Sequence, residues 1–126
     1  MEENKERDFE EETSSIFVEY FGSSSYIKIL DFLMQGQDFD YNMTEVARGA
    51  KVGWSSFTKI WDKLLEKKII VHTRNIGNAK LFRLNKEDYF VKKLIRFDWE
   101  LTKAEIDKLE NKQIEVEHWF FYNKKT

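Results

Sequence analysis

Hydroxyl and lysine side chains line one side of a predicted helix at Trp54–Leu64. The apolar residues of this segment recur at i, i+3, i+4 and i+7, which predicts a helix with one buried face. These apolar residues are Phe57, Ile60, Trp61 and Leu64. The opposite face carries Ser55, Thr58, Lys59, Asp62 and Lys63. Hydroxyl and ammonium groups donate hydrogen bonds, and lysine also attracts phosphate, so this face is suited to binding.

The groupings that mark enzymes and metal sites are missing from the sequence. His72 and His118 are far apart in the sequence and have no His-x3-His spacing, so we predict no metal site. There is no GxxxxGKS/T or GxGxxG loop, and the carboxylates of residues 10–12 lie in a charged run rather than a pocket. Ser23–Ser25 have no histidine nearby and are interpreted as helix caps. We therefore expect neither catalysis nor a bound cofactor.

Length and composition limit the number of domains and the compartment that we expect. The chain has 126 residues, enough for one domain with a modest core and an appendage. It has no cysteine, which fits a reducing compartment. No apolar run approaches the roughly 20 residues that span a bilayer, and the acidic N-terminus is unlike a signal peptide. We expect a cytoplasmic protein with no membrane association.

The elements before Trp54 are predicted from helical spacing and from stop signals. Residues 1–12 are highly charged and are expected to be a disordered or frayed acidic tail. A short helix is favoured over a strand at 16–21, ending at Gly22. A second helix is expected at Tyr26–Gln35, ending at Gly36. The alternating residues Phe39, Tyr41 and Met43 indicate a very short strand.

Two short helices and a hairpin follow. Thr44 is the predicted N-cap of a helix that runs to about Ala50. After a break at 51–53, the helix from Trp54 begins. The runs Ile69–Arg74 and Lys80–Leu84 read as strands, and the Gly and Asn residues of the five-residue loop between them favour a hairpin turn.

The order helix, short strand, helix, turn, helix, hairpin over Ser23–Asn85 resembles a winged helix domain. The run EKKIIVHTRNIGNAKLFRLN resembles the wing of archaeal winged helix transcription regulators, which are similar in architecture to MarR-type and ArsR-type repressors. One departure is Lys51, which stands where such motifs usually carry a left-handed glycine; Gly53 could relieve the turn instead. The expected fold is α+β, mostly α. Its expected parts are the tail 1–12, a winged helix domain with an N-terminal extension helix at 13–85, and a long helix with an aromatic tail at 86–126.

The segment from Lys86 to about Asn111 is predicted to be one long helix. Its bulky residues recur at alternating spacings of four and three, as in a heptad seam, with Val91 and Ile95 on one flank. The proposed dimerisation residues in this seam are Phe90, Leu94, Phe97 and Leu101. A stripe of this size needs a cover, so it packs either on its own domain or, in the preferred interpretation, on a second copy. For the aromatic run from Ile114 onward, a strand and a continued helix both remain open.

The resemblance implies a set of DNA-binding residues, because a winged helix inserts its second motif helix into the major groove. Ser55, Ser56, Thr58 and Lys59 are candidates for base edges and Lys63 for phosphate, while Trp54 either stacks on DNA or a partner or folds onto Val52. The candidate wing contacts are Arg74, Asn75, Asn78 and Lys80. Thr44 completes the set of candidate DNA-binding residues.

Charge is distributed in favour of this interpretation, although the net charge is −2. Residues 1–22 hold two basic and eight acidic side chains, a balance of −6, and residues 85–126 hold nine of each. Residues 23–84 hold ten basic and six acidic side chains, a balance of +4. This excess is mild, so one copy alone is expected to bind nucleic acid weakly.

The predicted function is sequence-specific binding of double-stranded DNA as a homodimeric transcription regulator. The alternative is a winged helix protein–protein adaptor that does not bind DNA, since a fold does not fix a function. A regulator that senses a small molecule is a third possibility, because 20 aromatic residues (4 Trp, 5 Tyr and 11 Phe) could line a pocket.

Overall fold

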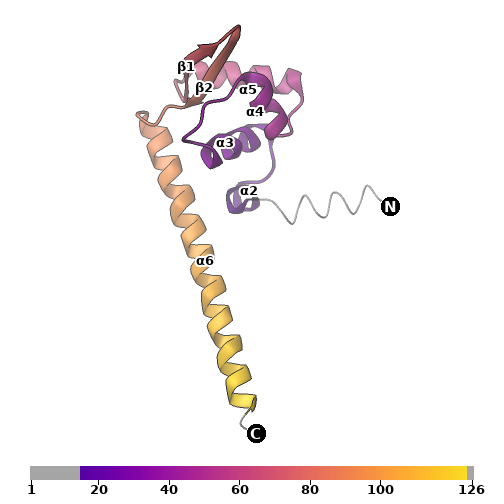
Figure 1. The fold of residues 1–126 in the computed structure, drawn as a ribbon, viewed down its shortest axis with the longest axis vertical. Coiled ribbons are helices and arrows are strands. Elements are labelled where there is room, and N and C mark those ends of the chain that lie inside the picture. Colours follow the sequence, from indigo (N-terminus) through magenta and orange to yellow (C-terminus); the bar gives the residue numbers. More distant parts are fainter. Residues whose placement is uncertain (1–14, 125–126) are drawn as a thin grey trace, which may run out of the picture.

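The computed structural model describes residues 15–124, with side chains for residues 15–112. A small head carries a two-stranded hairpin, and one long helix leaves it (Figure 1). The elements in order are α2 (Ile16–Phe21), α3 (Ser25–Gln35), α4 (Met43–Gly49), α5 (Trp54–Glu66), β1 (Ile70–Ile76), β2 (Ala79–Leu84) and α6 (Tyr89–Lys124). This is the predicted winged helix fold with a long C-terminal helix. The predicted acidic tail at 1–12 lies outside the described residues.

Serine caps and glycine stops set the first two helices, of which the stops at Gly22 and Gly36 and the serine cap of the second helix were predicted. Ser15 Oγ accepts a hydrogen bond from the Val18 N–H at 3.1 Å and caps α2. Gly22 ends α2 with φ at +89°, a conformation that favours glycine. Ser24 caps α3, which ends at Gly36. The helical interpretation of 16–21 is therefore confirmed over the strand.

The cap of α4 differs from the prediction. Asn42, not Thr44, is the N-cap: its side-chain oxygen accepts from the Glu45 N–H at 2.8 Å, and the Glu45 carboxylate accepts from the Asn42 N–H at 3.4 Å. This reciprocal capping box satisfies two backbone donors at once, which a threonine two positions later could not do. Thr44 lies exposed in the first turn of α4.

Both helices of the helix-turn-helix end in a Schellman motif with a lysine in the left-handed position. Lys51 has φ at +58° at the end of α4, and Lys68 has φ at +59° at the end of α5. The Val52 N–H donates to the Ala47 carbonyl at 3.0 Å. Lys51 thus takes the left-handed conformation itself. Gly53 does not relieve the turn, because its φ is −62° and it is the N-cap of α5.

The wing is an antiparallel hairpin with a tighter turn than predicted. The strands pair from Ile70 with Leu84 to Ile76 with Ala79, with an irregularity in register between His72 and Arg74. The turn has two residues rather than five, because Gly77 takes a φ of +59°. The predicted short strand at 39–43 is only a single bridge, in which Tyr41 and Phe82 exchange two backbone hydrogen bonds of 2.8 Å.

The core lies under the helix-turn-helix and is rich in aromatic residues. Phe57 and Trp61 are fully buried on α5, with ring centroids 5.1 Å apart, and Trp61 meets the Phe82 ring edge-on at 5.4 Å. Val91 of α6 is also fully buried and joins the long helix to this cluster. The predicted buried stripe of α5 therefore fixes which face of the helix remains outside.

Helix α6 begins at Tyr89, where the Asp88 carboxylate accepts from the Val91 N–H at 3.1 Å, and it runs to Lys124, beyond the predicted end near Asn111. The aromatic run from Ile114 thus continues the helix rather than forming a strand. The side chains of that run, His118 included, lie outside those described. Near the head, α2 packs on α6, where the Phe21 and Phe97 rings meet edge-on at 5.8 Å.

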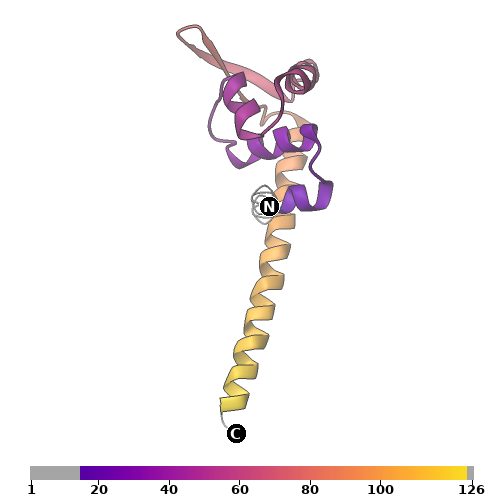
Figure 2. The same ribbon diagram turned by 90° about the vertical axis from the view of Figure 1, so that its right-hand side faces the viewer.

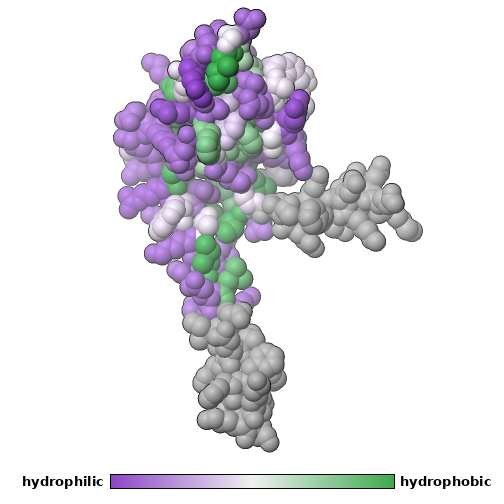
Figure 3. All heavy atoms as spheres, in the orientation of Figure 1, coloured by the Kyte–Doolittle hydropathy of each residue, from purple (hydrophilic) through white to green (hydrophobic). Residues whose placement is uncertain are grey.

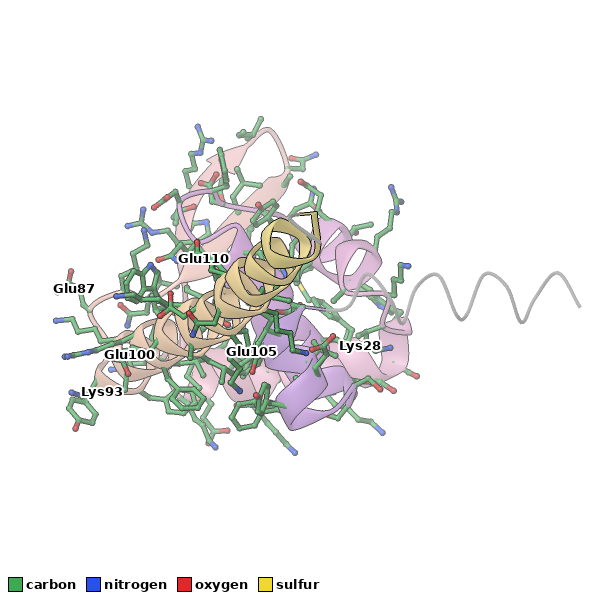
Figure 4. All side chains as sticks on the ribbon, turned by 90° about the horizontal axis from the view of Figure 1, so that it is seen from below. Lys28, Glu87, Lys93, Glu100, Glu105 and Glu110 are labelled. Carbon is green, nitrogen blue, oxygen red and sulfur yellow. The ribbon has the colours of Figure 1, made fainter. Side chains whose placement is uncertain are left out.

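Only part of the predicted seam is free in the single chain. Leu94 packs against the core of its own head, and Phe97 contacts Phe21, whereas Phe90 is half exposed. On the same side of α6, Tyr20 donates a hydrogen bond to Glu105. Seen from below, Glu105 lies on the α2 side of α6 and Glu100 on the other side (Figure 4). None of the helices described is long and apolar enough to cross a membrane.

Candidate nucleic-acid interface

The outer face of α5 is the predicted binding face, and the structure leaves it open. Phe57, Trp61 and Leu64 are buried, so the helix turns its polar residues outward. The exposed polar residues of α5 are Ser55, Ser56, Lys59, Asp62, Lys63 and Glu66. Thr58 is only half exposed, and its hydroxyl donates to the Ser55 carbonyl at 3.2 Å. The hydroxyls of the two serines and both ammonium groups remain turned to solvent.

Trp54 stands at the first position of α5 and is 54% exposed. Its ring stacks on Phe57 at a centroid distance of 5.5 Å and an interplanar angle of 24°. Its aromatic ring partner is therefore in its own helix. One side of a large indole is left open beside the hydroxyl groups of α5.

Of the predicted wing residues, Arg74 already has a partner in its own domain. Its guanidinium donates to the Asp40 carboxylate through Nε at 2.9 Å and through Nη2 at 3.1 Å. The Thr73 hydroxyl donates to the same carboxylate at 2.6 Å. These hydrogen bonds from Arg74 and Thr73 lower the pKa of Asp40 to about 2, so this carboxylate stays charged near neutral pH.

The remaining wing residues lie toward the turn. Asn75 Oδ1 is 2.6 Å from His72 Nε2, which holds that amide along the strand. Asn78 and Lys80 are exposed, and Asn75 pairs with Lys80 across the hairpin. The hairpin and α5 both lie at the end of the molecule away from the C-terminus of α6 (Figures 1 and 2).

Two charged residues of this region were not predicted from the sequence. Asp40 binds the wing, and Arg83 is exposed on β2 beside it. Both line an open hollow of about 530 Å³ at the base of the hairpin, together with Asp38, Val71, His72, Thr73 and Arg74. Strand alternation could have placed Arg83 on the outer side, but no local pattern joins Asp40 to a residue 34 positions later.

The structure also places the histidine and the dimerisation residues considered in the sequence. In the described part of the chain, no three His, Cys, Asp or Glu side chains gather as a metal would require. His72 lies on the exposed wing against Phe82 and Asn75. The candidate dimerisation residues Phe90, Leu94, Phe97 and Leu101 all lie on the first half of α6.

The fold defined by these elements is that of winged helix DNA-binding regulators of the MarR type. Solved structures that share it include a point mutant of Lactococcus lactis ZitR, with a TM-score of 0.51, 23% identity, and coverage of 75% of this chain and 68% of that one. Wild-type ZitR in complex with DNA matches with a TM-score of 0.50 and 23% identity over 68% of this chain and 60% of that chain. ZitR is described as a zinc-responsive MarR family member.

The adhesin competence repressor AdcR of Streptococcus pyogenes also matches, with a TM-score of 0.50 and 15% identity over 68% of this chain and 65% of that chain. Against several ZitR structures the chain spans about 60% of the neighbour's length. No protein-family model matches the sequence, and no curated protein matches it. At these identities the likeness establishes the fold.

Proposed function

We propose that this protein binds double-stranded DNA in a sequence-specific manner as a homodimeric transcription regulator of the cytoplasm. The observation that carries the proposal is the open serine and lysine face of α5, which shares one end of the molecule with the hairpin. A neighbour of the same fold was solved bound to DNA. The archaeal likeness of the wing fits the same class of regulator.

In the proposed complex the N-terminal half of α5 enters the major groove. Ser55, Ser56 and Thr58 then donate to base edges or accept from them, and Lys59 reaches guanine or phosphate. Lys63, one turn further, binds phosphate. Thr44 reaches a phosphate beside the groove from the first turn of α4, and Trp54 contacts sugar or thymine methyl groups with its open face.

A second copy is part of the proposal because the apolar side of α6 is covered at Val91 beside the head and open at Leu109. Leu109 lies 18 residues after Val91, about five helical turns, and therefore on the same face of α6. Val91 is fully buried by the head, whereas Leu109 is 66% exposed. A helix that projects alone is marginal in water, so its apolar side needs a partner. Hydrophobic atoms are visible on α6 below the head (Figure 3).

Substitution of Lys59 tests the docking of α5. Lys59→Ala should weaken binding to a duplex selected from random sequences, and it should lower the slope of log K against log salt by about 0.9 per copy, because each copy loses one phosphate contact. The control is Lys93→Ala, which removes an equal charge from α6 rather than from α5 and should leave both quantities unchanged. Fluorescence anisotropy at several salt concentrations measures the affinity and the salt slope of both variants. Equal salt slopes for Lys59→Ala and Lys93→Ala would refute this docking.

The protein–protein adaptor remains the second candidate, and the exposed Trp54 favours it. An adaptor would use this indole to bind another protein and would not need the lysines. The two functions separate in one experiment, since only the DNA-binding protein shows salt-dependent affinity for an arbitrary duplex.

A further inference from the structure

The basic side chains of the helix-turn-helix differ from those near the long helix in having no partner. Each of the six basic residues between 86 and 108 either pairs with a carboxylate or lies over an aromatic ring. Five exposed basic residues of the helix-turn-helix form no ion pair and meet no ring in the described part of the chain. They are Arg48, Lys59, Lys63, Lys67 and Lys68. Positive charge is therefore left uncompensated at α4 and α5.

The segment that precedes α2 has the opposite charge. Residues 1–14 lie outside the described part of the chain, but their sequence holds seven acidic and two basic side chains, a balance of −5. Residues 42–68, which span α4, α5 and the turn between them, hold six basic and three acidic side chains, a balance of +3. Opposite charges attract over about 10 Å at about 0.1 M salt and farther at lower salt. The acidic segment is thus complementary in charge to the helix-turn-helix of its own chain.

The length of the segment is sufficient for it to reach α5. Ser15, the N-cap of α2, donates a hydrogen bond from Oγ to Asp31 of α3 at 2.7 Å, which fixes the point where the segment joins the head. α2 lies on the side of the head toward the C-terminus of α6, and α5 lies at the other end (Figures 1 and 2). Fourteen extended residues span up to about 46 Å. A head of about 70 residues has a radius of gyration of about 11 Å and is about 28 Å across, so the segment can cross it.

We propose that the acidic segment 1–14 binds the outer face of α5 in its own head and competes there with DNA. The proposal rests on the proposed DNA-binding function. The carboxylates of Glu6 and of residues 10–12 take the positions of phosphates beside Lys59 and Lys63. A single exposed ion pair is weak, but tethering holds the segment near α5 at an effective concentration on the order of millimolar, so several weak contacts act together.

The bound segment lowers the affinity for DNA by the fraction of heads that it covers. A head whose α5 face is covered cannot bind DNA, so the apparent dissociation constant is the intrinsic one divided by the fraction of uncovered heads. Coverage of about nine heads in ten weakens binding about tenfold, for a selected and a random duplex alike. Salt weakens the contacts of the segment as well as those of DNA. The observed affinity therefore falls less steeply with salt than it does when the segment is neutral.

Neutralisation of the segment tests this competition in the full chain. The tail variant combines Glu6→Gln, Glu10→Gln, Glu11→Gln and Glu12→Gln, which removes four negative charges and keeps the side chains polar and of the same length. We expect it to bind a duplex about tenfold more tightly than the wild type at about 0.05 M salt, because α5 is no longer covered. Its slope of log K against log salt should be steeper, and the difference in affinity should vanish at high salt. Fluorescence anisotropy over a salt series measures both quantities.

The α6 variant is the matched control for the tail variant. It combines Glu87→Gln, Glu100→Gln, Asp107→Asn and Glu110→Gln, which replace four exposed acidic residues on or beside α6. The net charge changes by the same amount in both variants, but the α6 variant leaves the acidic segment intact. It should therefore alter the affinity less than about twofold. If both variants gain affinity equally, net charge rather than the acidic segment sets the effect, and the proposal is wrong.

Cross-linking detects the contact without DNA. A carbodiimide joins a carboxylate to an amine only where the two groups touch. We expect links between residues 6–12 and Lys59 or Lys63 at low salt, and fewer links at high salt or after a duplex is added. In protein mixed from isotope-labelled and unlabelled copies and allowed to exchange, these links should join residues of one copy. Links found only between copies would overturn the contact within one head.

The outcomes separate this proposal from the proposed function. If Lys59→Ala weakens binding while the tail variant binds like the wild type and no links form, the segment does not cover α5 and the DNA-binding function stands. If links form but neither the wild type nor the tail variant binds any duplex at low salt, the contact stands, whereas the competition with DNA and the proposed function fail together.

Discussion

Lys51 and Lys68 adopt a left-handed backbone conformation that is unfavourable for residues other than glycine. A side chain with a Cβ is strained at φ near +60°, and glycine is the usual residue at this position of a Schellman motif. Lys51 and Lys68 nevertheless hold it at φ of +58° and +59°. The hydrogen bonds of the motif and the buried pairs that follow them, such as Val52 against Ala47, over-determine the conformation. The lysines themselves keep positive charge at both helix ends, where it favours the helix dipole.

Lys68→Gly should therefore stabilise the protein. Relief of the left-handed strain exceeds the entropy that glycine adds to the unfolded chain, so the free energy of unfolding should rise by about 0.5–1 kcal/mol. Lys68→Ala is the matched control, because it removes the same charge but retains a Cβ, and it should give no gain. Urea denaturation followed by far-UV circular dichroism compares the three proteins. Equal gains in both variants would show that charge, not backbone strain, sets the effect.

At the scale of elements, the helices and the hairpin were predictable because their signals are local. Apolar spacing identified α3 and α5, serine and glycine marked the ends of α3, and Gly77 marked the turn. The cap of α4 was misassigned because Asn42 and Thr44 are both good caps and only the reciprocal contact with Glu45 decides between them. The end of α6 was missed because alternating residues after Ile114 also suit a strand. The bond between Asp40 and Arg74 depends on tertiary structure and leaves no pattern in the sequence.

The packing of α4 on α3 gives an element-scale prediction. Gly49, the last residue of α4, faces the Phe32 ring, which lies 5.0 Å from the Tyr41 ring, and a Cβ on Gly49 would overlap Phe32. Gly49→Ala should lower the free energy of unfolding by about 1–3 kcal/mol, although alanine normally favours a helix. Gly53→Ser is the control, since a Cβ there meets open space and serine can cap α5. If calorimetry gives Gly49→Ala an unchanged or higher melting temperature, α4 and α3 are less closely packed than described.

At the scale of the whole molecule, the head and the long helix differ in how far their apolar residues are buried. The head buries its own core, but α6 carries Ile106 and Leu109 beyond the cover of α2, 46% and 66% exposed. An apolar stripe that is buried at one end and bare at the other is incomplete in a single chain. The proposed pairing of two copies would complete it, and it would also double the basic surface available to one duplex.

Charged substitutions on α6 test the proposed pairing of two copies. Ile106→Glu combined with Leu109→Glu should give monomers in sedimentation velocity, because charge is introduced where the second copy is proposed to lie. Glutamate is a good helix former, so the head and α6 should remain folded. Asn111→Glu adds a charge on the opposite side of α6 and should leave the dimer intact. An unchanged sedimentation coefficient for the double variant would place the interface elsewhere or remove it.

The length of α6 has a consequence for the spacing of DNA sites. At about 1.5 Å per residue, its 36 residues form a rod of about 54 Å, longer than one turn of B-DNA at roughly 34 Å. The point at which the α6 helices of two copies cross would therefore set the distance between their two heads. A crossing near Tyr89 would bring the heads close together, and a crossing near Leu109 would hold them far apart. The number of base pairs in the spacer between paired half-sites would then report, without any further structure, where along the rod the two chains join.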